Sequence, residues 1–169
     1  MPEPSSQLIT PLITGFLEEI GITVTFASIS EQTFLPGLTI RQGFIILDEF
    51  RLSHPGDLLH EAGHLALLTP EQRRSATAPI DPDGGMELGA IAWSWAALTY
   101  LGLDPKVVFH PDGYRGGSQT IIDSFSQGRT FGVPILQWLG LTNAKMFPEM
   151  ICWLRPTAGP ASDETPGLD

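Results

Sequence analysis

Two histidines and a glutamate in residues 58–68 have the types and the spacing of a metal-dependent hydrolytic site. They form the pattern H-E-x-x-H through His60, Glu61 and His64. On an α-helix, residues four apart project from one face, so both imidazoles can reach a single metal ion. The carboxylate of Glu61 lies beside them and can take a proton from a metal-bound water. The pattern therefore predicts hydrolytic zinc chemistry, and the alternative is a core or solvated histidine pair without metal.

This chemistry requires a helix over residues 58–68, and the sequence predicts one. Ser53 offers a hydroxyl cap, and Asp57 is an acid near the positive end of the helix dipole. Residues 58–68 lack proline and β-branched side chains, and their apolar residues cover most of the helix surface. The helix should end at Thr69-Pro70, because the residue before a proline is pushed out of helical conformation. On such a buried helix, a metal ion would remove the cost of unpaired polar groups.

The composition indicates one globular domain. A chain of 169 residues with 42% hydrophobic content can bury one core but is too short for two comfortable domains. We expect this domain to cover residues 1–155. Residues 156–169 are polar and rich in proline and glycine, so we expect a disordered tail there.

The net charge argues against two classes of partner, and the cysteine content bears on the cellular compartment. The net charge of −10 argues against nucleic acid and against an anionic membrane, because both attract clustered Lys and Arg. The single cysteine, Cys152, can form no internal disulfide, and we recognise no signal peptide or membrane span. We therefore expect a cytoplasmic protein, and the sequence leaves its oligomeric state open.

The hydrophobic pattern predicts an α+β fold in which a small sheet packs on the motif helix and a largely helical half follows. We expect a three-stranded, mainly antiparallel sheet, in which Gln42-Gly43 forms the turn of a hairpin. Residues 71–85 are polar and rich in Pro, Asp and Gly, so we expect a loop. The other expected elements are strands over residues 22–27, 38–41 and 44–48, and helices over residues 6–20, 86–101, 118–127, 133–139 and 147–154.

The motif helix, the hairpin before it and Glu87 after it together resemble the zincin metallopeptidases. The resemblance covers roughly residues 38–101 and is closest to the compact gluzincin-like members, which have a small sheet and a second, glutamate-bearing helix. It implies that Zn²⁺ is held by His60, His64 and Glu87. It also implies Glu61 as the general base and a peptide or protein as the substrate. The alternative for the downstream glutamate is a first-turn acid favoured by the helix dipole, with Asp81, Asp83 or His110 as ligand instead.

Other families that share the motif fit less well. The metzincins carry a glycine and a third histidine where this chain has Leu67 and Pro70, and the peptide deformylases need a cysteine ligand upstream of the motif. The chain also departs from the thermolysin-like gluzincins, which carry an aspartate that orients a zinc-bound histidine at the position of Ile91. Another acceptor must orient the imidazole here. The candidates are a backbone carbonyl, Asp81, Asp83 and Asp123.

A loop over residues 107–117 is the second place where function is expected. It carries His110, Tyr114 and Arg115, which are side-chain types that stabilise an oxyanion, and we expect Tyr114 or His110 to do so. The alternative is a simple β-turn over residues 110–113. His54 is read as a neighbour of the helix cap and not as a ligand.

The resemblance leaves two other functions open. One is a non-enzymatic zincin fold that serves as a sensor or interaction module, with a structural metal or none, because fold does not guarantee activity. The other is hydrolysis of a small non-peptide amide, for which we expect a closed pocket. A peptidase would instead bind an extended chain along an exposed strand of the hairpin over residues 38–48.

Overall fold

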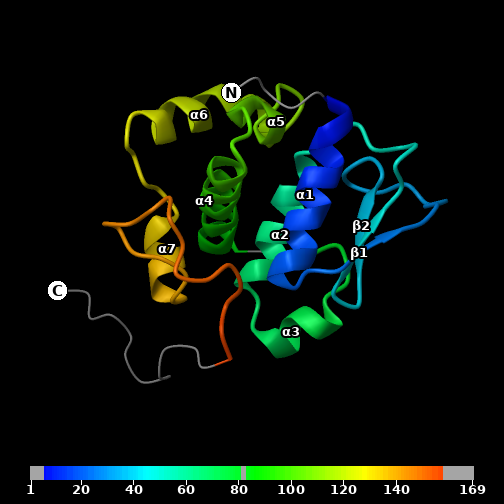
Figure 1. Cartoon of the computed structure of the whole chain (residues 1–169), viewed down its shortest axis with the longest axis horizontal. Helices are drawn as coiled ribbons and strands as arrows, with labels where there is room; N and C mark the ends of the chain where they lie inside the picture. The colour runs from blue at the N-terminus through cyan, green and yellow to red at the C-terminus, as the bar shows by residue number, and fades with distance from the viewer. Residues whose placement is uncertain (1–5, 81–82, 158–169) are drawn as a thin grey trace.

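The computed structural model of the chain describes residues 6–80 and 83–157. Within them the fold is α+β, with a three-stranded sheet and seven α-helices. Figure 1 shows α2 between the sheet and α4, with α5 and α6 at one end of the molecule. In chain order the elements are α1 (Ser6–Ile20), β1 (Val24–Phe26), β2 (Leu38–Arg41), β3 (Phe44–Leu47), α2 (Asp57–Leu67), α3 (Pro70–Ser75), α4 (Gly84–Leu101), α5 (Pro105–Val108), the 3₁₀ turn η1 (Tyr114–Gly116), α6 (Ser118–Ser126) and α7 (Val133–Trp138).

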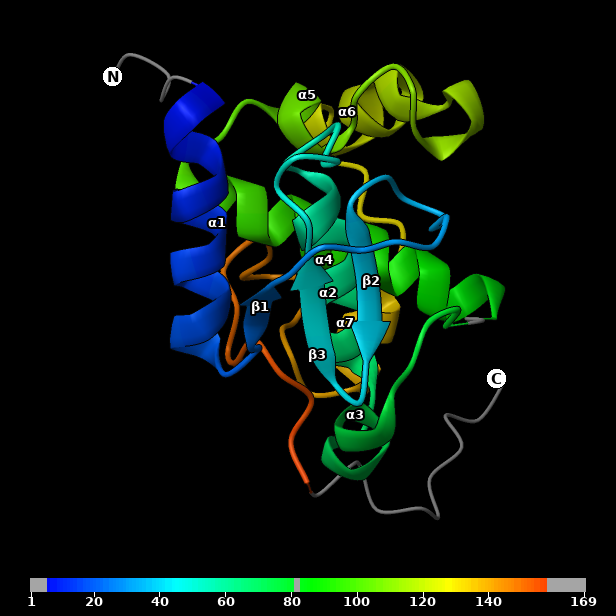
Figure 2. The same ribbon diagram turned by 90° about the vertical axis from the view of Figure 1, so that its right-hand side faces the viewer.

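The sheet is mixed, so the expectation of a mainly antiparallel sheet is wrong. Its strand order is β1-β3-β2, and Figure 2 shows β3 between the other two strands. β2 and β3 form the predicted antiparallel hairpin, in which Gln42 (φ 47°) and Gly43 (φ 81°) supply the left-handed turn. β1 runs parallel to β3, with Val24 opposite Ile45. Strand β2 lies between β1 and β3 in the sequence, but β3 lies between β1 and β2 in the sheet. The pattern of neighbouring segments therefore does not predict this parallel pairing.

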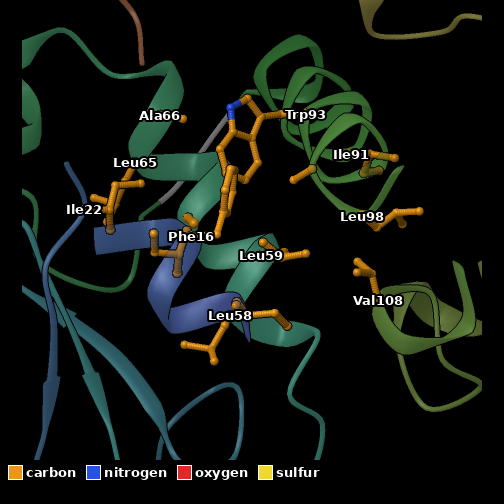
Figure 3. Packing of buried hydrophobic residues seen from close by; sticks show 14 of the residues in the cluster. Phe16, Ile22, Leu58, Leu59, Leu65, Ala66, Ile91, Trp93, Leu98 and Val108 are labelled. Carbon is orange, nitrogen blue, oxygen red and sulfur yellow. The ribbon is translucent and has the colours of Figure 1, made fainter. Parts of the chain in front are cut away.

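The hydrophobic core surrounds α2. One side of α2 packs on α1 and the sheet and the other side on α4, so Leu58, Leu59 and Leu65 are fully buried. Figure 3 shows these side chains with Phe16 of α1 and Trp93 of α4 in one cluster. Helix α4 is apolar on nearly all sides, and residues 89–94 and 96–98 in its middle are buried. None of the helices in the described ranges is long and apolar enough to cross a membrane.

Helices α2 and α4 approach each other closely at small residues. A Cβ atom at Gly63 of α2 would lie only 3.0 Å from the carbonyl oxygen of Ala90 in α4. At the next contact, a Cβ atom at Gly89 would lie 2.7 Å from Leu67. Because the missing side chains let the two backbones meet, the first turn of α4 lies beside the motif residues of α2.

The start of α2 differs from the expectation. No side chain among the described residues caps this helix, so the prediction of a Ser53 cap is wrong. The chain instead turns before the helix begins, and the amides of Asp57 and Leu58 donate to the carbonyls of His54 and Pro55. Ser53 therefore lies too early in the chain to reach the first helical amides.

Two segments also differ from the predicted pattern. Residues 70–75 form α3 and not a loop, because Thr69 and Gln72 make a reciprocal capping box. Residues 147–154 form turns and not a helix, and the amide of Ile151 donates to the carbonyl of Leu141. The other predicted helices are present, with α1 and α4 ending at left-handed glycines. Residues 158–169, most of the predicted tail, lie outside the described ranges.

We predict that Gly56→Ala destabilises the protein. Gly56 precedes α2, and a Cβ atom there would lie 2.0 Å from the carbonyl oxygen of Val107. One helix must move away from the other, which should lower the free energy of unfolding by about 1–3 kcal/mol. Urea denaturation measures the change.

The matched control for this substitution is Gly15→Ala in α1. A Cβ atom at Gly15 meets nothing within 4 Å, so alanine should stabilise the helix by about 0.5–1 kcal/mol. Equal effects of the two substitutions would show that the close contact at Gly56 is not a constraint.

Candidate metal centre

The two motif histidines face each other on α2. Their Nε2 atoms are 3.1 Å apart, and the rings are nearly perpendicular, with centroids 4.6 Å apart. Two nitrogen ligands of a tetrahedral zinc ion, each about 2.0–2.1 Å from the metal, lie about 3.3 Å from each other. The spacing of His60 and His64 therefore fits a shared zinc ion.

Glu87 joins the two histidines from the first turn of α4. Its carboxylate oxygens lie 3.3 Å from Nε2 of His64 and 3.8 Å from Nε2 of His60. A position in the first turn would by itself let the carboxylate point into solvent. It points instead at the histidines, and the close contact of α2 with α4 makes this possible. The three side chains form the two-histidine, one-carboxylate donor set that catalytic zinc sites use.

Burial keeps both histidines neutral. Removal from water, with the charges of His64 and His110 as further causes, lowers the pKa of His60 to about 3. Burial also lowers the pKa of His64 to about 4. At neutral pH both rings therefore keep the lone pair that a metal ion needs.

Burial acts on Glu61 in the opposite direction. Removal from water, followed by the negative charges of Asp57 and Glu87, raises the pKa of Glu61 to about 7. One of its carboxylate oxygens and a nitrogen from each of His60 and His64 all lie within 4.8 Å of one another. The position of this carboxylate beside both histidine nitrogens is the one that a general base takes at a catalytic metal site.

Tyr114 contacts the other nitrogen of the His60 ring. Its phenol oxygen lies 3.0 Å from Nδ1 of His60, so when Nε2 keeps its lone pair, Nδ1–H donates to this oxygen. The backbone of Tyr114 has φ 55° and that of Arg115 has φ 53°, a left-handed conformation that is strained for such side chains. This contact suits Tyr114 to hold the imidazole ring of His60 in its orientation. It also places the phenol away from Nε2 of His60, the ring nitrogen that faces Glu87.

Neither of the predicted orienting carboxylates that the structure describes has a hydrogen bond to a motif histidine. Asp83 caps α4, where its carboxylate accepts from the amide of Met86. Asp123 accepts from the side-chain amide of Gln119. Asp81 lies outside the described residues.

His110 belongs to a second cluster. Its Nε2 atom lies 2.7 Å from Oδ1 of Asp57, and its ring stacks on His54 with centroids 3.5 Å apart. His54 in turn lies 3.1 Å from Asp112. No described hydrogen bond joins His110 to the three proposed ligands, so its predicted role as oxyanion donor or fallback ligand gains no support.

The role of Asp57 differs from the expected one. The sequence predicts an acid that interacts with the helix dipole, but the side chain is buried and paired with His110. Asp57 stands three residues before His60 and four before Glu61, so helical spacing places it on the same side as the motif. That spacing indicates a place beside the motif, but it does not identify His110 as the partner.

Comparison with known proteins found no relative. No protein-family model matches the chain, and neither the curated proteins nor the solved structures contain a significant match. The resemblance to zincins therefore rests on the sequence motif alone.

We predict that Tyr114→Phe weakens zinc binding. The substitution keeps the ring but removes the acceptor for Nδ1–H of His60, and loss of such a partner typically costs 10–100-fold in metal affinity. Zinc titration against a competing chelator measures the change. Tyr100→Phe, at a phenol that is exposed in α4, is the control. Equal zinc affinity in both variants would contradict the orienting role.

We also predict that Glu61→Gln stabilises the metal-free protein in a pH-dependent way. Because the folded pKa of Glu61 is raised from 4.5 to about 7, the native state holds its proton more tightly, and stability falls as pH rises through that interval. Glutamine should therefore raise the free energy of unfolding by about 1–3 kcal/mol at pH 8 and by much less at pH 4.5. Urea denaturation in a chelator at both pH values measures the difference.

The two histidines also make stability depend on pH, in the opposite direction. Their folded pKa values are lowered, so they destabilise the protein as pH falls below 6.5. This contribution is common to the wild type and the variant and cancels in the comparison. A stability gain of the same size at both pH values would rule out a buried carboxylate at this position.

Proposed function

We propose that the protein is a zinc-dependent hydrolase that cleaves peptide bonds. In this proposal His60, His64 and Glu87 hold the zinc ion, and Glu61 is the general base. The main observation behind the proposal is that the carboxylate oxygens of Glu87, on α4, lie 3.3 Å from Nε2 of His64 and 3.8 Å from Nε2 of His60, both on α2. The resemblance to gluzincin-like peptidases leads to the same ligand set.

The chemistry divides between the ion and the chain. A bound zinc ion would supply a Lewis acid and lower the pKa of a water molecule to about 7. Glu61 would accept the proton of the attacking water and pass it to the leaving amine. Its carboxylate lies within 4.8 Å of the ligand nitrogens of His60 and His64, which would put it beside the water that the ion holds. Tyr114 would hold the ring of His60 in place.

The outer edge of β2 limits how a substrate can bind. Leu38 and Ile40 turn their backbone groups away from β3, because Gly37, Thr39 and Arg41 face it. The amide of Leu38 already donates to the carbonyl of Leu35. The carbonyl of Ile40 already accepts from the amide of Ala78. Each of these two residues therefore has one outward-facing group engaged within the chain.

This arrangement disfavours addition of a long antiparallel peptide. Antiparallel addition uses the amide and the carbonyl of the same residue, so it would have to displace either Leu35 or Ala78. The remaining carbonyl of Leu38 and amide of Ile40 can bond one residue of a parallel segment. The covered edge thus favours a second candidate function, hydrolysis of a small amide or of a short peptide end.

We predict that Glu61→Gln abolishes hydrolysis while zinc remains bound. Glutamine keeps the size of the side chain but removes the basic carboxylate, so turnover of a cleaved peptide should fall by about 10²–10⁴-fold. Zinc content is measured by elemental analysis of the same samples. The matched control is Glu71→Gln, at an exposed position of α3, which should keep full activity.

Two further results decide among the alternatives. Glu87→Ala should lose zinc as well as activity, and retained zinc would show that this residue is not a ligand. Comparing a long unstructured peptide with a capped dipeptide amide tests the role of the β2 edge. If the zinc-loaded wild type cleaves neither these nor a broad peptide library, the non-enzymatic module replaces the hydrolase.

A further inference from the structure

The four histidines of the chain form two pairs, and only one pair belongs to the candidate metal centre. The second pair, His54 and His110, lies with Asp112 where the approach to α2 meets the loop after α5. One potential ligand atom from each of these three residues lies within 4.8 Å of the others. We propose that His54, His110 and Asp112 form a second binding site for a divalent transition-metal ion.

The orientation of His110 is the main support for this proposal. Its Nε2 atom contacts the buried carboxylate of Asp57 at 2.7 Å, so Nε2 carries the proton and donates it to Asp57. This is the carboxylate–histidine arrangement that commonly supports a metal-bound imidazole. It leaves the lone pair on Nδ1, and Nδ1 is buried without a hydrogen-bond partner among the described residues. A metal ion would give this nitrogen the partner that it lacks.

His54 and Asp112 are the movable members of the site. The side chain of His54 is 29% exposed and that of Asp112 is 77% exposed, and the two contact each other at 3.1 Å. The rings of His54 and His110 are stacked, with only 9° between their planes. Because imidazole lone pairs lie in the ring plane, His54 must turn out of this stack to share an ion with His110. The exposure of His54 and Asp112 leaves room for that movement.

The donor set selects the class of ion. Two imidazoles and one carboxylate suit zinc and related transition metals, whereas calcium and magnesium prefer oxygen ligands. The stacked rings must move before they can share an ion, so the site should bind more weakly than the His60–His64–Glu87 centre, whose histidine nitrogens already lie 3.1 Å apart. Its residues are distinct from that centre, and so the two sites can be removed separately.

The test is zinc binding by isothermal titration and equilibrium dialysis of the full chain after treatment with a chelator. We expect two equivalents of Zn²⁺ in the wild type and one in His54→Ala or Asp112→Asn, with loss of the weaker one. The matched control Glu49→Gln changes another exposed carboxylate and should keep both equivalents. Thermal unfolding without zinc should be nearly unchanged in Asp112→Asn, at an exposed carboxylate, and the same measurement checks that His54→Ala folds.

The outcomes separate this proposal from the proposed function. If His54→Ala and Asp112→Asn bind as much zinc as the wild type, with the same affinities, the second site does not exist. If zinc is lost in these variants to the same extent as in Glu49→Gln, the binding is nonspecific and the proposal fails. If Glu87→Ala keeps all its zinc while His54→Ala loses an equivalent, the second site holds and the assignment of Glu87 fails.

Discussion

The close contact between α2 and α4 is the constraint on which the candidate centre depends. Neither helix carries a complete set of donors, and the glycine at position 63 opposite Ala90 lets Glu87 reach the histidines of α2. The same packing removes the site from water. Burial is the largest cause of both the lowered pKa of His60, which keeps its ring neutral, and the raised pKa of Glu61 in the metal-free protein. Apolar packing and the chemistry of the site are therefore not separable properties of this fold.

The fold could be predicted from the sequence wherever local rules decide it. Glycines mark the ends of α1 and α4, the Gln42-Gly43 turn sets the register of β2 and β3, and apolar periodicity locates the long helices. The parallel pairing of β1 with β3 could not be predicted, because it depends on a chain crossing and not on a turn. The polar composition of residues 71–85 predicts a loop, but the capping box of Thr69 and Gln72, a local pattern in the sequence, starts α3 there.

The candidate site was predictable to the extent that helical spacing defines it. The motif predicts that His60 and His64 face each other on one helix. The role of Glu87 as third ligand is implied only by the family resemblance, and in the structure its carboxylate lies close to both histidines. The hydrogen bond between His60 and Tyr114 could not be predicted, because the two residues are 54 positions apart. The left-handed backbone that holds Tyr114 also has no recognisable residue pattern. The pairing of Asp57 with His110 is equally remote in sequence. Supporting contacts of this kind are decided by tertiary structure.

The covered edge of β2 also bears on the behaviour of the protein in solution. A strand with open amides and carbonyls is a template on which strands of other molecules can grow, and natural proteins protect such edges. Here the chain protects its own edge, since residues 76–78 supply hydrogen-bond partners to Ile40, Gln42 and Gly43. The hairpin is thereby shielded against sheet-to-sheet aggregation on this side. Self-association through this edge would have to displace these internal partners or use only the carbonyl of Leu38 and the amide of Ile40.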